Sequence, residues 1–92
     1  MSTGHPEQYT GEATAGSGGA MTDDVGVITG DLTLITSARP DGQADIRVQY
    51  TGADEWYTLT GSPATVPTGN LETFHAAVLA AIEEGGAAAV PR

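Results

Sequence analysis

Between Val25 and Thr60, apolar and polar residues alternate with a period of two, and short turn sequences interrupt the alternation at regular intervals. This pattern is typical of β-strands that bury one face. The turns are expected at Gly30-Asp31, at Pro40-Asp41-Gly42 and at Gly52–Glu55, where glycine, proline and acidic residues favour tight reversals. Four strands are predicted between them: Val25–Thr29, Leu32–Arg39, Gln43–Thr51 and Trp56–Gly61.

The three turns can be tested against one another through the strand registers that they imply. They place Leu34 opposite Val48, Tyr50 opposite Tyr57, and Val27 opposite Leu34. All three registers put one apolar set on the same face of the sheet, and a slip of one residue in any of them would break the agreement. The predicted inner face consists of Val25, Val27, Leu32, Leu34, Ile46, Val48, Tyr50, Tyr57 and Leu59.

A helix is predicted over Leu71–Glu84. Asn70 is a favourable N-cap, and Gly85-Gly86 ends the helix. Apolar residues recur at helical spacing and form one stripe that should cover the apolar sheet face. The fold class is therefore α+β: a four-stranded antiparallel β-meander followed by one C-terminal amphipathic helix packed on one face. The stripe consists of Leu71, Phe74, His75, Val78, Leu79 and Ile82.

The ends of the chain have a different composition. Residues 1–22 are mostly small and polar, and Gly11–Ala20 cannot bury apolar surface in proportion to its ordering entropy, so we expect a flexible N-terminal tail. The domain is expected over residues 23–86, and residues 87–92 as a loose C-terminal end. A domain of this size is marginal for independent stability, so oligomerisation is expected.

The charge balance limits the classes of partner. The 92 residues include 12 acidic residues, three arginines and no lysine, and the net charge is −9. This acidity argues against nucleic acid and anionic membranes as partners. The absence of cysteine excludes disulfides and thiolate ligands. Neither a membrane span nor a signal peptide is visible, so we expect a cytoplasmic protein, and the use of arginine over lysine fits a high-GC bacterial genome.

No motif in the sequence specifies a catalytic residue, a cofactor or a metal site, and we expect none of them. His75 lies on the apolar stripe of the helix, and we expect a core histidine that shares a hydrogen bond with Tyr50 or Tyr57. The alternative is a base or ligand for a small enzymatic or ligand-binding domain around His75. The segment ending in Gly85-Gly86 resembles the diglycine end of ubiquitin-like modifiers, but here we expect it to stop a helix.

The opposite, outer face of the predicted sheet carries apolar residues that a solvated face seldom gathers. Tryptophan and arginine are enriched at the centres of protein interfaces. We therefore expect a non-enzymatic protein-interaction or regulatory module that uses this face and forms a homodimer. The predicted partner-binding residues are Trp56, Arg47, Ile35, Ile28 and Thr58.

An alternative function follows from the acidic residues. Glu83 and Glu84 end the helix, where negative charge opposes the helix dipole, and Asp54 and Glu55 lie in a turn. Together they would form an acidic patch. Such a surface is typical of an inhibitor or immunity protein, or of a nucleic-acid mimic, that blocks a basic site.

Overall fold

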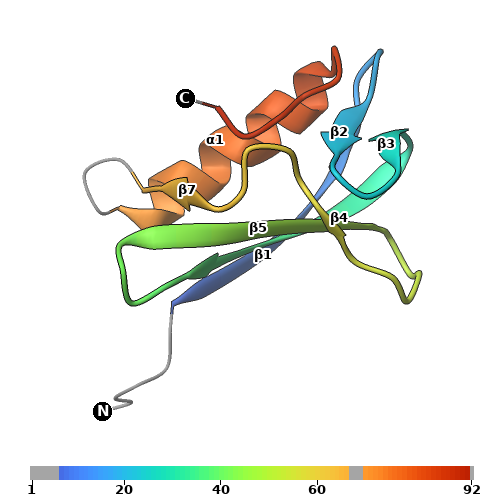
Figure 1. The fold of residues 1–92 in the computed structure, drawn as a ribbon. Helices are drawn as coiled ribbons and strands as arrows, with labels where there is room; N and C mark the ends of the chain where they lie inside the picture. Colours follow the sequence, from blue (N-terminus) through green and yellow to red (C-terminus); the bar gives the residue numbers. More distant parts are fainter. Residues whose placement is uncertain (1–6, 67–69, 92) are drawn as a thin grey trace.

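The computed structural model describes residues 7–66 and 70–91 and shows an α+β fold (Figure 1). One antiparallel sheet has the strand order β1-β4-β5-β6, with β7 also paired to β5, and β2 and β3 form a separate two-stranded sheet. A single helix, α1, packs on the larger sheet. The elements are β1 (Gln8–Thr14), β2 (Ala20–Thr22), β3 (Gly26–Ile28), β4 (Asp31–Ala38), β5 (Gln43–Tyr50), β6 (Tyr57–Thr58), β7 (Ala64–Thr65) and α1 (Leu71–Glu84).

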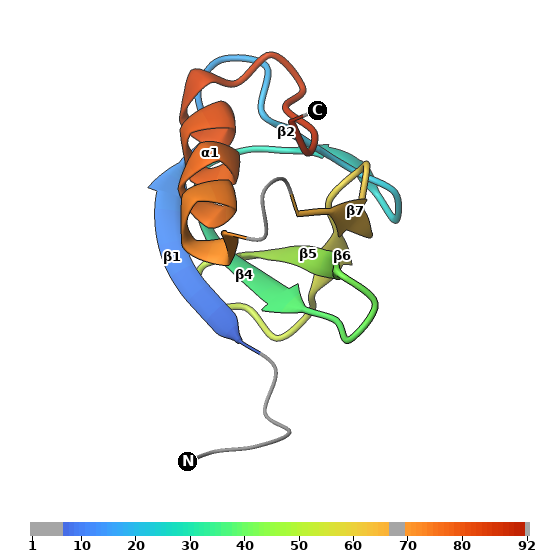
Figure 2. The ribbon, with the colours of Figure 1, turned by 90° about the vertical axis from the view of Figure 1, so that its left-hand side faces the viewer.

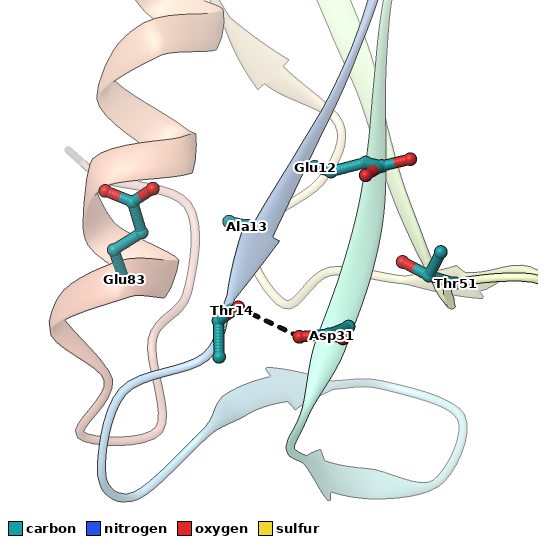
Figure 3. Close-up of a pocket in the computed structure, with 6 residues that line it drawn as sticks. All are labelled: Glu12, Ala13, Thr14, Asp31, Thr51 and Glu83. Carbon is teal, nitrogen blue, oxygen red and sulfur yellow. Dashed lines mark hydrogen bonds between the residues drawn. The ribbon is translucent and has the colours of Figure 1, made fainter.

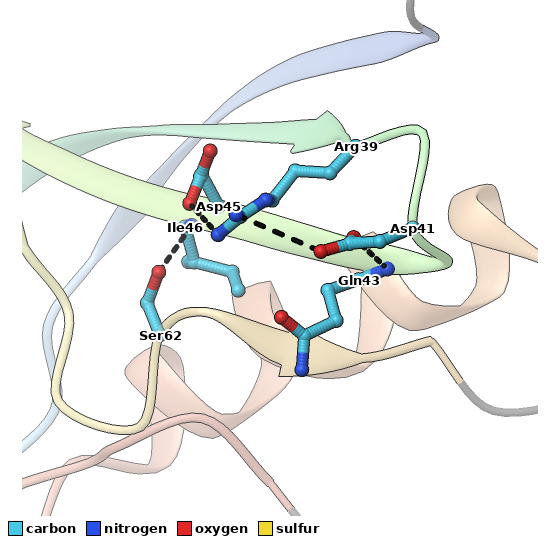
Figure 4. A network of polar contacts seen from close by, with 6 residues as sticks. All are labelled: Arg39, Asp41, Gln43, Asp45, Ile46 and Ser62. Carbon is cyan, nitrogen blue, oxygen red and sulfur yellow. Dashed lines mark hydrogen bonds and ion pairs between the residues drawn. The ribbon is translucent and has the colours of Figure 1, made fainter.

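The register between β4 and β5 is confirmed, with Leu34 opposite Val48. The turn that sets it is held by local contacts (Figure 4). Asp41 accepts a hydrogen bond from the backbone N–H of Gln43 at 3.0 Å, and the guanidinium of Arg39 lies 3.6 Å from the carboxylates of both Asp41 and Asp45. These exposed ion pairs contribute little stability, but they hold the Arg39 side chain along the start of β5.

The register between β5 and β6 differs from the prediction by two residues. Val48 lies opposite Tyr57, because the connection after β5 is longer than a tight turn. A shift of two residues keeps every side chain on its face, so Leu59 is still fully buried. Between β6 and β7, the hydroxyl of Ser62 accepts a hydrogen bond at 2.8 Å from the N–H of Ile46 in β5 (Figure 4). At this point a side-chain hydroxyl, instead of a backbone carbonyl of a neighbouring strand, accepts the hydrogen bond from β5.

The predicted flexible tail is wrong for residues 8–22. Strand β1 pairs along its whole length with β4, so Gly11 rather than Val27 lies opposite Leu34. The apolar face of β1 was hidden in the sequence because one of its inward positions is glycine. Leu79 of α1 packs closely over this glycine: a Cβ at Gly11 would lie 2.9 Å from Cδ1 of Leu79, so that side chain would have to move. The first six residues of the expected tail lie outside the described residues.

Because β1 takes the predicted place of the first meander strand, the residues of that strand change environment. Residues 26–28 pair with β2, not with β4. Ile28, expected on the exposed outer face, is buried with 2% of its surface exposed. Val25 and Val27, expected in the core, are 56% and 45% exposed. Tyr50 is also exposed, at the far end of β5.

The predicted helix is confirmed at both ends. Asn70 caps it by accepting a hydrogen bond from the N–H of Thr73 at 3.0 Å, and Gly85 ends it with a φ of 83°. The helix lies along β1 and also contacts β4 (Figure 2). Its buried residues are Leu71, Phe74, His75, Val78 and Ile82. Among the described residues, no helix is long and apolar enough to cross a membrane.

The C-terminal segment is not loose over its described part. Ala88 and Val90 are buried, and the N–H of Val90 donates to the carbonyl of Thr60 at 2.9 Å. Three successive amides, those of residues 86–88, donate to the carbonyls of residues 17–19. Residues 85–88 and 16–19 therefore run side by side, and we call this pairing the terminal clamp. The prediction missed it because small residues carry few signals of burial.

Candidate functional site

The outer face is the side of the five-stranded sheet opposite α1. Its centre lies on adjacent strands, where Ile35 of β4 is paired with Arg47 of β5, and Arg47 is paired with Thr58 of β6. Trp56 precedes β6 and is 36% exposed, which is high for the largest apolar side chain of the chain. A hollow of about 220 Å³ lies among these side chains and is lined by Gln8, Ile35, Ser37, Asp45, Arg47 and Trp56.

Four of the five predicted partner-binding residues are thus on one face. Trp56, Arg47 and Ile35 line the same hollow, and Thr58 is the cross-strand neighbour of Arg47. Ile28 does not belong to the face, because it is buried in the core. The remainder of the face is polar; for example, the hydroxyls of Thr33 and Thr51 are hydrogen-bonded at 3.0 Å. The exposed apolar surface is therefore small and local.

The two described arginines differ in their partners. Arg39 forms ion pairs with Asp41 and Asp45, whereas Arg47 forms no ion pair within residues 7–66 and 70–91. Arg47 is also exposed. An exposed guanidinium that is not neutralised, beside an indole, offers both charge and an apolar surface to a ligand. This pair is the chemically most distinctive feature of the outer face.

A second hollow, of about 410 Å³, lies at the end of β1 near the C-terminal half of α1 (Figure 3). Three carboxylates line it, those of Glu12 in β1, Asp31 in β4 and Glu83 in α1. The hydroxyl of Thr14 donates to Asp31 at 2.9 Å. No group of acidic residues or histidines in the described ranges is arranged to hold a metal ion.

The structure does not bring the four residues of the predicted acidic patch together at this hollow. Only Glu83 of that patch lies at this hollow, together with Glu12 and Asp31, which the sequence did not single out. Glu84 is exposed, as are Asp54 and Glu55 in the connection after β5. Glu55 accepts a hydrogen bond from the hydroxyl of Tyr57 at 3.0 Å, which raises the pKa of Tyr57. The sequence does not point to Glu12, because it predicts a flexible tail where the structure has β1.

His75 is a core residue, as expected, but its partner differs from the predicted tyrosines. It is 7% exposed, and its Nδ1 lies 2.8 Å from the hydroxyl of Thr36 in β4. Its ring is stacked on Tyr9, with ring centroids 5.8 Å apart. Burial lowers the pKa of His75, so the neutral form is favoured at neutral pH. His75 thus joins α1 to β4 and β1 within the core.

Comparison with known proteins gives no further guide. No family model matches the chain, and no curated protein or solved structure matches it. The function must therefore be inferred from the surfaces described above.

Proposed function

We propose that this chain is a non-enzymatic protein-binding module whose outer face binds a segment of a partner protein at Trp56 and Arg47. The observation that supports the proposal most directly is the meeting of these two side chains and Ile35 around one hollow. Indole and guanidinium groups supply most of the binding free energy in many protein interfaces. On the other face of the sheet, α1 packs over β1 and β4.

The chemistry of the hollow defines the expected partner. Arg47 would bind a carboxylate, since its planar guanidinium can donate two parallel hydrogen bonds to the two oxygens of that group. Trp56 and Ile35 would contact an aromatic or aliphatic side chain next to that carboxylate. A partner segment with an acidic residue beside a large apolar residue therefore fits best.

A second copy of the chain fits this face less well. With Ile28 buried, Trp56 and Ile35 are the large apolar side chains left at its centre. A stable face-to-face dimer buries about 800 Å² per partner around an apolar core, which this mostly polar face does not provide. Self-association through the outer face is therefore the alternative that the experiment below can detect.

A random-peptide phage library panned against the purified chain tests the proposal. We expect enriched peptides to carry an acidic residue next to an aromatic or aliphatic one. Trp56 is the only tryptophan, so binding can be followed by its fluorescence. With labelled peptides, Trp56→Ala should weaken binding at least tenfold, and Arg47→Gln by roughly tenfold.

The matched control is Val27→Thr, which alters an exposed apolar residue of β3 outside the outer face. This variant should bind like the parent chain. Equal binding by the parent, Trp56→Ala and Arg47→Gln would refute the proposal. A dimer in sedimentation analysis that Trp56→Ala dissociates would replace the heterologous partner with a second copy.

The acidic hollow favours a second candidate function, the blocking of a basic site on another protein. Glu12, Asp31 and Glu83 line it, and none of them forms an ion pair within the described part of the chain. Binding by these carboxylates should weaken steeply as salt is raised, whereas a contact centred on Trp56 should tolerate salt. Salt dependence of any captured partner therefore separates the two functions.

A further inference from the structure

Strand β1 is an edge strand of its sheet: β4 pairs with one side of it, and its other side is free. The backbone of residues 7 and 15 bonds to residues 38 and 30, at the two ends of the β1–β4 ladder. Because bonded and non-bonded positions alternate in antiparallel pairs, the odd-numbered residues of β1 bond to β4. The N–H and C=O groups of Gln8, Thr10, Glu12 and Thr14 therefore point away from the sheet. No backbone group elsewhere in the described ranges bonds to them.

This edge lacks several of the features by which proteins protect an exposed strand. Protected edges are short or bulged, carry charged residues (above all lysine) or proline, or are covered by a helix or loop. Here β1 is seven residues long, its pairing with β4 is regular, and Glu12 is its one charged residue. All four outward-pointing residues are exposed. The edge is therefore available to an added strand.

A second copy of the chain is a poor occupant of this edge. In a pair of antiparallel β1 strands, even-numbered residues would face even-numbered residues, so both α1 helices would lie on the same side. Each α1 packs chiefly over its own β1. Neighbouring strands are about 4.8 Å apart, whereas packed helices need about 8–10 Å between their axes. In this antiparallel pairing the two helices would crowd each other, so an extended segment without a helix above it fits the edge better.

The charge beside the edge specifies the occupant further. Glu12 projects from β1 itself, and Glu83 and Asp31 lie around the same hollow at the end of the strand. Glu12 and Asp31 lie on the face opposite α1, which they share with Thr33, and their carboxylates favour lysine or arginine on that side of an incoming strand. On the α1 side, half-buried Leu79 lies over Gly11 and favours a small apolar side chain next to it.

We propose that the free edge of β1 binds an extended segment of a partner protein that alternates basic and small apolar residues, and adds it to the sheet as a further strand. Backbone hydrogen bonds to Gln8, Thr10, Glu12 and Thr14 would supply the affinity. The carboxylates of Glu12 and Asp31, on the face opposite α1, would select basic side chains. The proposal does not depend on the outer-face site, because it uses different groups.

The probe is a synthetic ten-residue peptide of alternating lysine and valine, with a matched peptide of alternating glutamate and valine. We expect the lysine peptide to bind and the glutamate peptide to bind at least tenfold more weakly. The amides of Thr10 and Glu12 should become protected from hydrogen exchange and show nuclear Overhauser contacts to the peptide backbone. Methylation of alternate peptide nitrogens keeps the charge but removes the edge hydrogen bonds, and it should weaken binding at least tenfold.

On the protein, Thr10→Pro removes an N–H that faces the free edge while sparing the bonds to β4. It should weaken lysine-peptide binding at least tenfold, whereas Thr10→Val, which keeps the N–H, should bind like the parent. Glu12→Gln should weaken binding severalfold and flatten its salt dependence. Trp56→Ala should leave peptide binding unchanged, so failure of this proposal is distinguishable from failure of the outer-face proposal.

Several results would overturn the proposal. Equal binding of the methylated and unmethylated lysine peptides would show that charge alone holds the peptide. The same conclusion would follow if Thr10→Pro, folded by circular dichroism, bound like the parent chain. A dimer of the parent chain that Thr10→Pro dissociates would show that the edge is occupied by a second copy.

Discussion

The hydroxyl oxygen of Thr36 lies 2.8 Å from Nδ1 of His75 and joins the centre of β4 to α1 within the core. Thr36 is fully buried, and the other side of the imidazole is covered by Tyr9 of β1. No buried side-chain nitrogen or oxygen among the described residues is without a hydrogen-bond partner. This polar pair therefore fixes the position of α1 on the sheet by a directional contact rather than by apolar packing alone.

Removing the hydroxyl of Thr36 should destabilise the chain. Thr36→Val keeps the shape of the side chain but leaves Nδ1 of the buried His75 without its partner. We expect a loss of about 1–3 kcal/mol in the free energy of unfolding, measured by urea denaturation. Thr36→Ser keeps the hydroxyl, loses only a methyl group, and should cost less. Equal losses for both variants would show that the hydrogen bond does not matter.

The burial of His75 should make stability depend on pH. Its pKa is lowered below the ordinary value of 6.5 in the folded chain, so the unfolded chain binds the proton more readily. The free energy of unfolding should therefore fall as the pH is lowered from above 6.5 to the folded pKa. Below the folded pKa, the stability that the neutral form of His75 contributes is lost completely. Urea denaturation between about pH 7.5 and pH 5 measures this slope, above the range in which most carboxylates titrate.

Two substitutions separate His75 from the other histidine of the chain. His75→Asn places a neutral amide near Nδ1 and should flatten the pH dependence, even if it lowers stability at every pH. His5→Gln should leave the slope unchanged. A slope that persists in His75→Asn, or that disappears in His5→Gln, would contradict the assignment.

The burial of Ile28 predicts a sharp contrast with its neighbour in β3. Ile28 is 2% exposed and Val27 is 45% exposed. Ile28→Ala should lower the free energy of unfolding by about 2–5 kcal/mol through the cavity it leaves. Val27→Ala should change it by less than about 0.5 kcal/mol. A larger loss for Val27→Ala than for Ile28→Ala, measured by thermal or urea denaturation, would favour the predicted meander, in which Val27 is in the core.

The terminal clamp predicts that Gly16 does not tolerate a side chain. A Cβ at Gly16 would overlap the carbonyl oxygen of Glu83 and lie 2.7 Å from the carbonyl carbon of Glu84. Gly16→Ala should therefore force the helix end away, at a cost of about 2 kcal/mol or more, and speed amide exchange at residues 86–88.

Gly42→Ala is the comparison for this substitution. Gly42 has a φ of 86° but open space around it, so the change should cost only about 1 kcal/mol and leave the clamp intact. If Gly16→Ala were no more harmful than Gly42→Ala, and exchange at residues 86–88 stayed slow, the close approach in the clamp would be wrong.

The parts of the fold that the sequence predicts are those with strong local signals. The turn at Pro40-Asp41-Gly42 fixes one register, and Asn70 and Gly85 mark both ends of the helix. The long-range pairings were missed, because they involve residues that look unstructured alone. Strand β1 shows little alternation, since Gly11 stands where an apolar residue would normally signal burial. Leu79 of α1 packs closely over that position, and only the three-dimensional structure shows this contact.

The same distinction applies to the candidate sites. Ile35 and Arg47 lie on strands whose register the sequence predicts, so their meeting on the outer face could be foreseen. Trp56 lies on the predicted face because the β5–β6 register differs from the prediction by two residues, and a shift by an even number leaves every side chain on its face. The acidic hollow could not be foreseen, since Glu12 reaches Asp31 and Glu83 only through the pairing of β1 with β4 and its packing under α1.

The terminal clamp also bears on how the chain acquires its fold. Ala20 is bridged to Ala88, and residues 17–19 bond to residues 86–88, so the clamp joins segments that lie far apart in the sequence. Contacts of such high sequence separation carry a large loop-closure cost and slow folding. The pairing of β1 with β4 and its covering by α1 are also long-range, so these parts should form together in one cooperative step.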